Sequence, residues 1–365
     1  MRLKRFVIRS AGAIFLALVV AALVAYGTSS NDCDRRSAAQ GELMKAIVYC
    51  DYGSPDVLRL EEIARPVPDD SQVLIKVRAA AVNPLDWHYM RGTPYIGRAG
   101  MGLRKPKVTG LGVDVAGRVA AVGSKVTRFK PGDEVFGSAR GAFSEYVCAS
   151  EGRLVLKPEN LTFQQAASVP VAAITALQGL RDKGKLQAGQ KVLINGASGG
   201  VGTFAVQIAK SLGAHVTGVC STRNVDMVRS LGADEVVDYT KADFTRAGQR
   251  YDVILDNVGN HSLSACRRVL TPRGRYVMVG GPKGRWVAPL DRALAATVYS
   301  WFVSQHVGMF MARMNKEDLG ILRDLMESGK VTPVLDRTYT LSQVPDAIRY
   351  LETGHARGKV VIAVD

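Results

Sequence analysis

The sequence predicts an α/β protein of two domains, in which a partly closed β-barrel precedes a doubly wound parallel sheet. A length of 365 residues suits about two domains plus a tail. Residues 44–168 contain many short apolar segments separated by glycine and proline turns, which is typical of a barrel. Residues 169–330 alternate between strand-like and helix-like segments, which indicates βαβ units and a parallel sheet. Residues 1–43 form a separate N-terminal segment.

The N-terminal segment has the composition of a membrane anchor or a secretory signal. Basic side chains within the first ten residues precede an apolar run over residues 11–26. As a helix this run is about 24 Å long, which is short for a bilayer unless its flanks contribute. The tripeptide Ala25-Tyr26-Gly27 also fits a signal-peptidase site. We therefore expect an N-terminal hydrophobic helix, as an anchor over residues 11–27 or a signal segment, and a polar linker over residues 28–43.

Charge and cysteine content exclude some classes of protein and leave others open. The net charge of +15 suits a solvated basic surface, anionic ligands or an anionic membrane face. No dense basic run interleaved with aromatic residues occurs outside the N-terminus, so a nucleic-acid partner is not favoured. None of the five cysteines forms a CxxC pair, which excludes a cysteine-rich zinc lobe. Their scatter also argues against a disulfide framework and predicts a reducing compartment or indifference to redox state.

Strand predictions for the first domain rest on alternating or continuous apolar segments. Turn signals separate these segments, at Pro66-Val67-Pro68, Pro131-Gly132-Asp133 and Gly141. Many short strands with such turns indicate a partly closed barrel. The expected strands are Met44–Tyr49, Val57–Ile63, Gln72–Val82, Val113–Val122 and Glu134–Phe136.

The second domain contains a glycine-rich turn between a strand and a helix. The apolar segment Lys191–Asn195 predicts a buried strand, and Thr203–Leu212 has helical apolar spacing. In that context the turn predicts a dinucleotide site, because glycines permit a tight turn and close approach of a pyrophosphate. The free N–H groups of the helix N-terminus would face the phosphates, and Gly202 would allow close packing of helix on strand. The cofactor contacts predicted here are Gly196, Ser198, Gly199, Gly200, Val201 and Gly202.

The end of the next strand predicts which dinucleotide is bound. His215–Cys220 is the expected strand, and proteins that prefer NADH usually carry an acid at its end. This sequence has Ser221-Thr222-Arg223 there instead. Hydroxyls and a guanidinium suit a 2′-phosphate, so NADPH is the predicted cofactor. The alternative is that Arg223 is a solvated loop residue without such a contact.

Further strands place more residues at the same edge. Strands are expected at Glu235–Asp238, Tyr251–Leu255 and Arg275–Val279, and a helix at Asn315–Gly329 ends the domain. Ligands of parallel sheets bind at the carboxyl ends of the strands. The contacts predicted there are Tyr239, Asn257, Val258 and Gly280.

Four segments in a fixed order carry a resemblance to a known family. They are residues 52–58, 81–86, 112–119 and 129–135. Together they resemble the medium-chain dehydrogenase/reductase superfamily, in its zinc-free quinone oxidoreductase-like branch, over residues 44–365. The resemblance implies a GroES-like substrate domain over residues 44–168, completed by residues 331–365, and a Rossmann NADP-binding domain over residues 169–330. It also places Thr175 and Lys359 near the nicotinamide; the alternatives are helix packing for Thr175 and a solvated amine for Lys359.

Departures from the zinc alcohol dehydrogenases predict a metal-free site. Where those enzymes carry a zinc-binding cysteine, this sequence has Asn83-Pro84, as the quinone branch does. Where they carry Gly-His-Glu, it has Gly112-Val113-Asp114. Without a thiolate and an imidazole, zinc has no ligands from which to polarise a carbonyl. We therefore expect no zinc and no metal ligands.

The predicted activity is hydride transfer from NADPH to a quinone or an α,β-unsaturated carbonyl, in which the cofactor carries the chemistry. By resemblance, Tyr52 lies in the substrate cleft and Tyr95 corresponds to the acid tyrosine of related enoyl reductases. Asn83 can donate an amide hydrogen bond to a substrate oxygen. Structural roles remain the alternative for all three, and Asp86 is interpreted as a local hydrogen-bonding residue. The alternative functions are a 2-enoyl thioester reductase, and an NADPH-binding sensor or RNA-binding protein with little turnover.

Partners and location follow less directly from the sequence. The apolar stretch from Trp286 to Met314 suits core packing, a dimer face, a substrate cleft or membrane contact, and we expect a homodimer. The basic N-terminus predicts a cytoplasmic end with the rest of the chain exported, whereas NADPH is expected in the cytoplasm. We expect membrane association through residues 11–27. A cytoplasmic protein is the alternative if Met44 is the true start.

Overall fold

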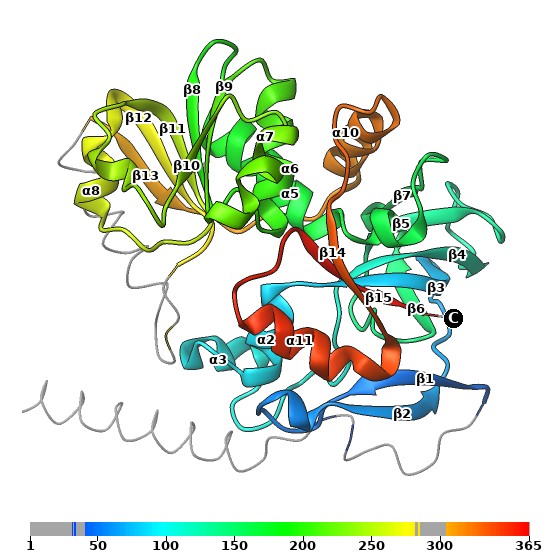
Figure 1. Cartoon of the computed structure of the whole chain (residues 1–365). Coiled ribbons are helices and arrows are strands. Elements are labelled where there is room, and N and C mark those ends of the chain that lie inside the picture. Colours follow the sequence, from blue (N-terminus) through cyan, green and yellow to red (C-terminus); the bar gives the residue numbers. More distant parts are fainter. Residues whose placement is uncertain (1–30, 32, 34–40, 282–283, 285–303, 365) are drawn as a thin grey trace, which may run out of the picture.

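The computed structural model describes residues 31, 33, 41–281, 284 and 304–364. It consists of a half that contains a curled, mostly antiparallel sheet and a half built on a parallel sheet (Figure 1). The expected anchor over residues 11–27, and most of the apolar stretch from Trp286 to Met314, lie outside the described residues. Within the described ranges, no helix combines the length and the apolar character that crossing a bilayer requires.

The barrel half centres on β3 (Gln72–Val82), an 11-residue strand that is antiparallel to three neighbours. Most of its side chains are buried on both faces, because neighbouring parts of the half cover both sides of it. The sheet order is β14-β15-β3-β4-β5-β7, with β6 also paired to β3, and β1 and β2 form a separate antiparallel pair. The other strands are β1 (Leu43–Val48), β2 (Arg59–Ala64), β4 (Asp114–Val122), β5 (Glu134–Ser138), β6 (Tyr146–Ser150), β7 (Leu154–Leu156), β14 (Leu335–Thr340) and β15 (Lys359–Ala363).

The second half has six parallel strands in the order β10-β9-β8-β11-β12-β13. The chain runs outward from β8 to β10, then returns to the middle and runs outward again from β11 to β13. The order therefore reverses between β8 and β11, which is where open α/β sheets bind their ligands. The strands are β8 (Lys191–Asn195), β9 (His215–Cys220), β10 (Glu235–Asp238), β11 (Tyr251–Asp256), β12 (Leu270–Met278) and β13 (His306–Met309).

Helices cover both faces of the parallel sheet. Figure 1 shows α5, α6 and α7 on one side of it and α8 on the other. The longest of these, α6, begins after Gly199 and buries an apolar stripe against α5 and β8. The helices are α2 (Pro84–Arg91), α3 (Arg98–Met101), α4 (Phe163–Ala167), α5 (Pro170–Gln178), α6 (Gly200–Ser211), α7 (Val225–Ser230), α8 (Leu263–Arg268), α10 (Lys316–Glu327) and α11 (Val344–Glu352).

One hydrophobic cluster joins the two halves. Ala81 of β3 and Phe136 of β5 are fully buried in the same cluster as Ile174 of α5 and Phe204 of α6. The barrel and the parallel sheet therefore share packing, and a ligand at the edge of one meets a fixed surface of the other.

The predicted α/β architecture is confirmed in its main elements. The strands β3, β9 and β10 have the bounds expected from their apolar patterns. The strand expected from Val57 begins later, at Arg59, because Pro55–Val57 form a 3₁₀ turn with proline at its first position. The last expected strand of the parallel sheet begins earlier than Arg275, at Leu270.

The interpretation of the cysteines was wrong in one respect. Cys33 and Cys50 form a disulfide 17 residues apart in sequence, and Asn31 Nδ2 donates to the Cys50 carbonyl at 2.7 Å. The pair joins a short segment before the first strand to the end of β1, and no spacing motif in the sequence marks such a closure. The other cysteines, Cys148, Cys220 and Cys266, are free.

Loss of this disulfide is expected to lower the free energy of unfolding by about 3 kcal/mol, because closing a loop of this length restricts the unfolded chain. We would measure urea unfolding of Cys33→Ser and the parent protein with and without reductant. Reductant should destabilise the parent and leave Cys33→Ser unchanged. Cys148→Ser is the control and should respond to reductant as the parent does; an unresponsive parent would show that the bond does not form in solution.

Candidate functional site

The glycine-rich turn lies between β8 and α6, and two of its glycines are sterically required. Gly196 has a φ of +77°, in the region that side chains rarely adopt. A Cβ on Gly202 would lie 2.1 Å from the Gly196 carbonyl oxygen, so only glycine lets the helix approach the turn. A helix that begins directly at a closely packed glycine turn, with the N–H groups of its first turn, is an anion-binding arrangement.

The turn is also bound to the barrel half through the end of the chain. The Gly358 amide donates to the Ser198 carbonyl at 2.9 Å, and Gly199 forms a parallel bridge with Gly358. A Cβ on Gly200 would lie 3.0 Å from Cδ of Lys359, so the lysine side chain runs alongside the first turn of α6. The predicted contacts of the phosphate loop and the predicted nicotinamide-side lysine therefore lie together.

The end of β9 carries the residues predicted to select NADPH. Thr222 Oγ1 donates to Asp238 Oδ2 at 2.6 Å, and Ser221 accepts from Asn224. The guanidinium of Arg223 donates to the His355 carbonyl at 2.8 Å, so it points toward the loop before β15. Hydrogen bonds from Thr222 and Thr240 lower the pKa of the Asp238 carboxyl to about 2.

The neighbouring strand ends add a second group of predicted contacts. Asn257 Nδ2 donates to the Asn195 carbonyl at 3.0 Å, while its Oδ1 is buried without a hydrogen-bond partner among the described residues. A Cβ on Gly280 would lie 2.1 Å from the Asn257 carbonyl oxygen, so glycine is needed there too. Val258 and Tyr239 are exposed at the same edge, 42% and 55% respectively. A buried acceptor without a partner suits a ligand that donates to it.

A buried polar cluster occupies the barrel side of the site. Lys359 Nζ donates to Asn83 Oδ1 at 2.6 Å and lies 3.4 Å from Asp114 Oδ2. Asn83 Nδ2 in turn donates to Asp114 at 2.9 Å and to the Ala81 carbonyl at 3.2 Å. None of the three side chains is more than 3% exposed. Burial raises the pKa of the Asp114 carboxyl, and the nearby Lys359 ammonium opposes that rise.

The cluster reaches across to the parallel-sheet half. The other carboxylate oxygen of Asp114 accepts the Val171 amide, in the first turn of α5, at 2.9 Å. Thr175, one turn further along α5, donates to the Val171 carbonyl at 2.6 Å and is half-buried. Both amide protons of the Asn83 side chain and its oxygen therefore have partners within this cluster and its surroundings.

Tyr52 and Tyr95, the two tyrosines predicted for the substrate cleft, both lie against the side chain of Arg98. The Arg98 guanidinium is 4.4 Å from the centre of the Tyr52 ring and 4.7 Å from that of Tyr95. Tyr52 donates its hydroxyl proton to the Gly102 carbonyl at 2.8 Å, and burial raises the pKa of that hydroxyl. In this arrangement the Tyr52 hydroxyl is held by the backbone of the loop after α3.

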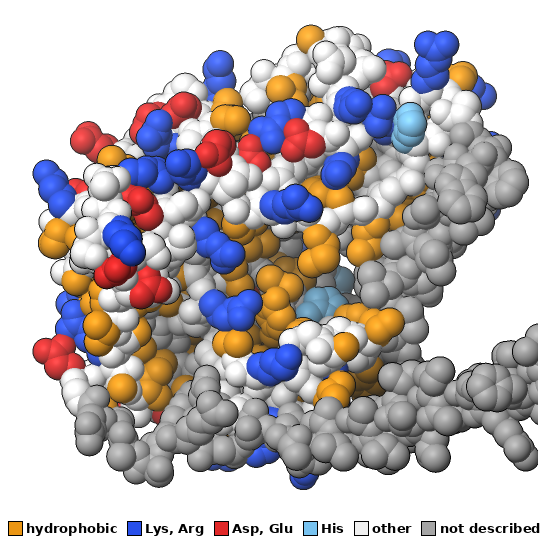
Figure 2. Space-filling model, turned by 180° about the vertical axis from the view of Figure 1, so that it is seen from behind, with side chains coloured by type: hydrophobic (Ala, Val, Ile, Leu, Met, Phe, Trp, Pro, Cys, Tyr) orange, Lys and Arg blue, Asp and Glu red, His pale blue; other side chains and the backbone are white. Residues whose placement is uncertain are grey.

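A cavity of about 490 Å³ lies in the same half, and none of Tyr52, Asn83, Tyr95 and Lys359 is among the residues that line it. Its wall is largely apolar. Figure 2 shows the face opposite that of Figure 1, which is hollowed, with hydrophobic side chains in the hollow and basic ones at its border. Asp86 and Leu85 of α2 line the cavity, as does Val113, the residue before Asp114. The remaining lining residues are Tyr49, Tyr89, Gly100, Met101, Lys107, Val108, Gly110, Leu111, Gly112, Ala139, Arg140 and Arg153.

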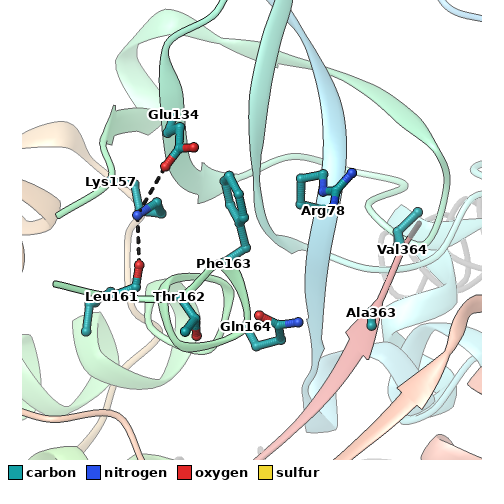
Figure 3. A pocket seen from close by; sticks show the side chains of 9 residues that line it. All are labelled: Arg78, Glu134, Lys157, Leu161, Thr162, Phe163, Gln164, Ala363 and Val364. Carbon is teal, nitrogen blue, oxygen red and sulfur yellow. Dashed lines mark hydrogen bonds and ion pairs between the residues drawn. The ribbon is translucent and has the colours of Figure 1, made fainter. Parts of the chain in front are cut away.

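A second cavity, of about 410 Å³, lies between α4 and the end of β15 (Figure 3). Lys157 inside it donates to the Leu161 carbonyl at 2.7 Å and pairs with Glu134 at 3.2 Å. No residue predicted for the site lines this cavity, so we assign it no part in the reaction.

The residues at the parallel-sheet edge fit a nicotinamide dinucleotide. The cradle of Gly196 and Gly202, the first turn of α6 and the partnerless oxygen of Asn257 are the features such a cofactor needs. Among the described residues, no group of three or more histidine, cysteine or carboxylate side chains is arranged to hold a metal ion.

Comparison with known proteins identifies the family. Residues 69–159 match the alcohol dehydrogenase GroES-like domain, and residues 231–362 match a family described as zinc-binding dehydrogenase. A 2-methylene-furan-3-one reductase of Solanum lycopersicum is 37% identical, over 87% of this chain and 79% of that protein. The chain belongs to the medium-chain dehydrogenase/reductase superfamily. It falls in the quinone oxidoreductase-like branch, as the resemblance implied.

Two further relatives indicate the type of reaction. A chloroplastic NADPH-dependent alkenal/one oxidoreductase of Arabidopsis thaliana is 37% identical over 87% of this chain and 79% of that one. The solved quinone oxidoreductase of Coxiella burnetii superposes with a TM-score of 0.80 at 33% identity, covering 89% of this chain and all of that one. The chain is thus an NAD(P)H oxidoreductase of the quinone and alkenal/one reductase type, as predicted.

Two parts of the site were missed by sequence reasoning. Asp114 was noted only for replacing a zinc-enzyme motif, yet it links β4 to α5. Asp86 was interpreted as a local hydrogen-bonding residue, and it does accept the Asn83 amide at 2.7 Å, but it also lines the cavity. An asparagine three residues before an acid is a helix-capping pattern, and it explains why Asp86 accepts the Asn83 backbone N–H. The same pattern gives no sign that Asp86 lines a cavity.

Gly202→Ala should lower both stability and cofactor affinity, because the new methyl group overlaps the Gly196 carbonyl. We expect a loss of about 1–3 kcal/mol in the free energy of unfolding and weaker NADPH binding, measured by thermal unfolding and by fluorescence titration. Gly320→Ala in α10, where a Cβ meets nothing within 4 Å, is the control. It should gain about 0.5–1 kcal/mol; equal behaviour of the two variants would contradict the steric argument.

Proposed function

We propose that the protein reduces quinones and α,β-unsaturated carbonyl compounds with NADPH, without zinc. The observation that carries this proposal is the contact between the phosphate loop and the buried Lys359–Asn83–Asp114 cluster, beside a largely apolar cavity. A dinucleotide on the loop would bring its nicotinamide end toward that cluster. A planar apolar acceptor suits the cavity wall.

The residues of the parallel-sheet half would hold the cofactor. Gly196, Ser198, Gly199, Gly200, Val201 and Gly202 would surround the pyrophosphate, with Asn257, Val258, Gly280 and Thr175 nearer the nicotinamide. Bound there, the nicotinamide supplies a hydride. Ser221, Thr222, Arg223 and Tyr239 would contact the 2′-phosphate, which suits hydroxyls and a guanidinium. The three residues at the end of β9 include no carboxylate that would repel a phosphate, which supports this assignment.

The residues of the barrel half would orient the acceptor and exclude water. Lys359 keeps a positive charge close to the first turn of α6, where it would favour developing negative charge. We propose Tyr52 and Tyr95 as cleft residues that contact the substrate, supported by their common partner Arg98. The zinc-free proposal is supported by Asn83 and Asp114, whose side chains bind each other and an ammonium group.

A second candidate substrate class is a 2-enoyl thioester. Lys107, Arg140 and Arg153 line the same cavity, and such a basic border suits the phosphate of a carrier. This candidate uses the same hydride chemistry and differs only in the group that occupies the cavity border.

Homodimer formation and membrane association through residues 11–27 stay predictions. Sedimentation in detergent would test the first, and vesicle flotation would test the second.

Arg223→Asp is expected to reverse the preference for NADPH over NADH. Loss of a charge-assisted hydrogen bond, with repulsion added, should weaken NADPH binding at least about tenfold and leave NADH binding little changed. We would measure both dissociation constants by fluorescence titration. Arg229→Asp on α7, an exposed residue with the same change of charge, is the control. A preference unaltered by Arg223→Asp would remove Arg223 from the 2′-phosphate site.

The function itself is tested by oxidation of NADPH and NADH by the full-length chain. The acceptors would be 1,4-quinones, alkenals and a 2-enoyl thioester, each with and without a chelator. We expect NADPH-preferring turnover of quinones or alkenals that the chelator does not change. Turnover confined to the thioester would favour the second candidate. NADPH binding without turnover of any acceptor would contradict the enzymatic proposal and favour a sensor or RNA-binding role.

A further inference from the structure

Asp86 is a fully buried carboxyl group at the wall of the cavity. It lies in the first turn of α2, where its Oδ2 accepts a hydrogen bond from the backbone N–H of Asn83 at 2.7 Å. Its Oδ1 forms no hydrogen bond of ordinary geometry with the described residues, although the Gly112 backbone N–H is near enough to lower the pKa of the carboxyl. A buried carboxyl oxygen without a partner is rare, because removing it from water is costly. Such an atom beside a cavity suits contact with a ligand.

The groups around Asp86 come from several elements. Asp114 of β4 and Lys359 of β15 face it from the buried cluster, and Tyr49 and Tyr89 share the cavity wall with it. Arg140, Lys107 and Arg153 lie at the border of the cavity. Burial, opposed by the Asn83 amide and supported by the Asp114 charge, raises the pKa of the Asp86 carboxyl to about 7. The group can therefore both hold and release a proton near neutral pH.

We propose that Asp86 is the general acid that protonates the substrate in the cavity during reduction of an α,β-unsaturated carbonyl. This inference rests on the proposed function and names the residue that supplies the proton after the hydride has been transferred. Three contacts connect the phosphate loop to the cavity: Gly200 with Lys359, Lys359 with Asn83, and Asn83 with Asp86. The acid and the hydride donor would thus act on one substrate from neighbouring sides.

The step balances in atoms and electrons. With the cofactor bound, hydride would add to the β-carbon, and the electron pair of the C=C bond would move onto the carbonyl oxygen to give an enolate, whose C=O bond re-forms when the α-carbon takes up a proton. The Asp86 carboxylic acid then gives its proton to the α-carbon, where a C–H bond forms, and is left as a carboxylate. Water that enters through the cavity restores the proton. The net change is reduction of the alkene by one hydride and one proton.

Other groups near the cavity are less suited to this step. Burial raises the pKa of the Tyr49 hydroxyl far above neutrality, which makes it a poor proton donor. The Tyr52 hydroxyl proton is already donated to the Gly102 carbonyl. Asn83 has no ionisable proton, and its amide hydrogens are both used. Asp86 carries the carboxyl group among the lining residues, and its pKa is raised to about 7.

The test compares Asp86→Asn with Asp324→Asn in the full-length protein. Asparagine keeps the shape and can still accept the Asn83 amide, so α2 should form. Asp324 is an exposed carboxylate on α10 that pairs with its neighbour Arg323 and undergoes the same change. With an alkenal, Asp86→Asn should reduce kcat by about 100-fold or more, while reduction of a 1,4-quinone is largely retained, because hydroquinone oxygens take protons from water. Asp324→Asn should match the parent.

The dependence of the alkenal reduction rate on pH distinguishes a proton donor from a residue with a purely structural role. In the parent, alkenal reduction should fall as pH rises through about 7, because the carboxyl loses the proton that it must donate. Asp86→Asn should lack this descent. Asp86→Glu, which restores an acid, should recover part of the rate with a shifted profile.

Two readouts do not depend on turnover. Infrared difference spectra between acidic and basic pH should show a carboxylic-acid band that disappears through about pH 7 and is missing in Asp86→Asn. The second readout is stability. Between the ordinary carboxyl pKa of 3.8 and the raised value of about 7, the folded state holds a proton that the unfolded state has released. Raising the pH from 3.8 to about 7 should therefore lower the free energy of unfolding of the parent relative to that of Asp86→Asn.

The outcomes separate this inference from the function on which it rests. Alkenal turnover by Asp86→Asn at the parental rate and with the parental pH profile would overturn the role of Asp86 and leave the reductase proposal standing. Loss of the pH descent in Tyr95→Phe but not in Asp86→Asn would assign the proton to Tyr95 instead. Absence of turnover by the parent protein with every acceptor would overturn both proposals.

Discussion

The arrangement of the site depends on one buried ammonium group. Lys359 is 3% exposed and donates to Asn83, with the Asp114 carboxylate beside it. An unpaired charge at this depth would cost several kcal/mol, so the three side chains keep β15, β3 and β4 in one register. The residue before Lys359 binds the phosphate loop, and Asp114 binds the start of α5. The charge pair therefore fixes the barrel to the cofactor edge at two points.

Around this pair, the two halves divide the chemistry between them. The parallel sheet contributes backbone: glycines that permit close approach, and amide groups at the first turn of α6. The barrel contributes side chains, which are mostly bound to each other and so hold defined positions. Asp86 is the exception, since one of its oxygens remains available beside the cavity. A rigid shell with one group left unsatisfied is a common arrangement where proton transfer is needed.

Much of the fold was predictable because its signals are local. The strand, glycine turn and helix around Gly202 lie within about twenty consecutive residues, and period and turn chemistry identify them. The contacts of Lys359 with Gly200 and Asn83 were not predictable from pattern, since Lys359 and Asn83 are 276 positions apart in sequence. The roles of Asp86 and Asp114 depend on burial, and a carboxylate looks the same in a sequence whether it is solvated or buried. The Cys33–Cys50 pair follows no spacing motif, so only coordinates reveal it.

The pairing of β15 with β3 has a consequence for how the protein reaches its native state. These strands are hydrogen-bonded neighbours, yet the whole parallel-sheet half lies between them in sequence. Contacts of such large sequence separation close late, because the loop entropy must be overcome before they contribute stability. The barrel therefore cannot complete its sheet until the intervening half has become compact and brings its ends together. Until then the Ala79–Val82 part of β3 lacks the partner that β15 supplies, and that edge is where an incompletely folded chain is most exposed to association with other chains.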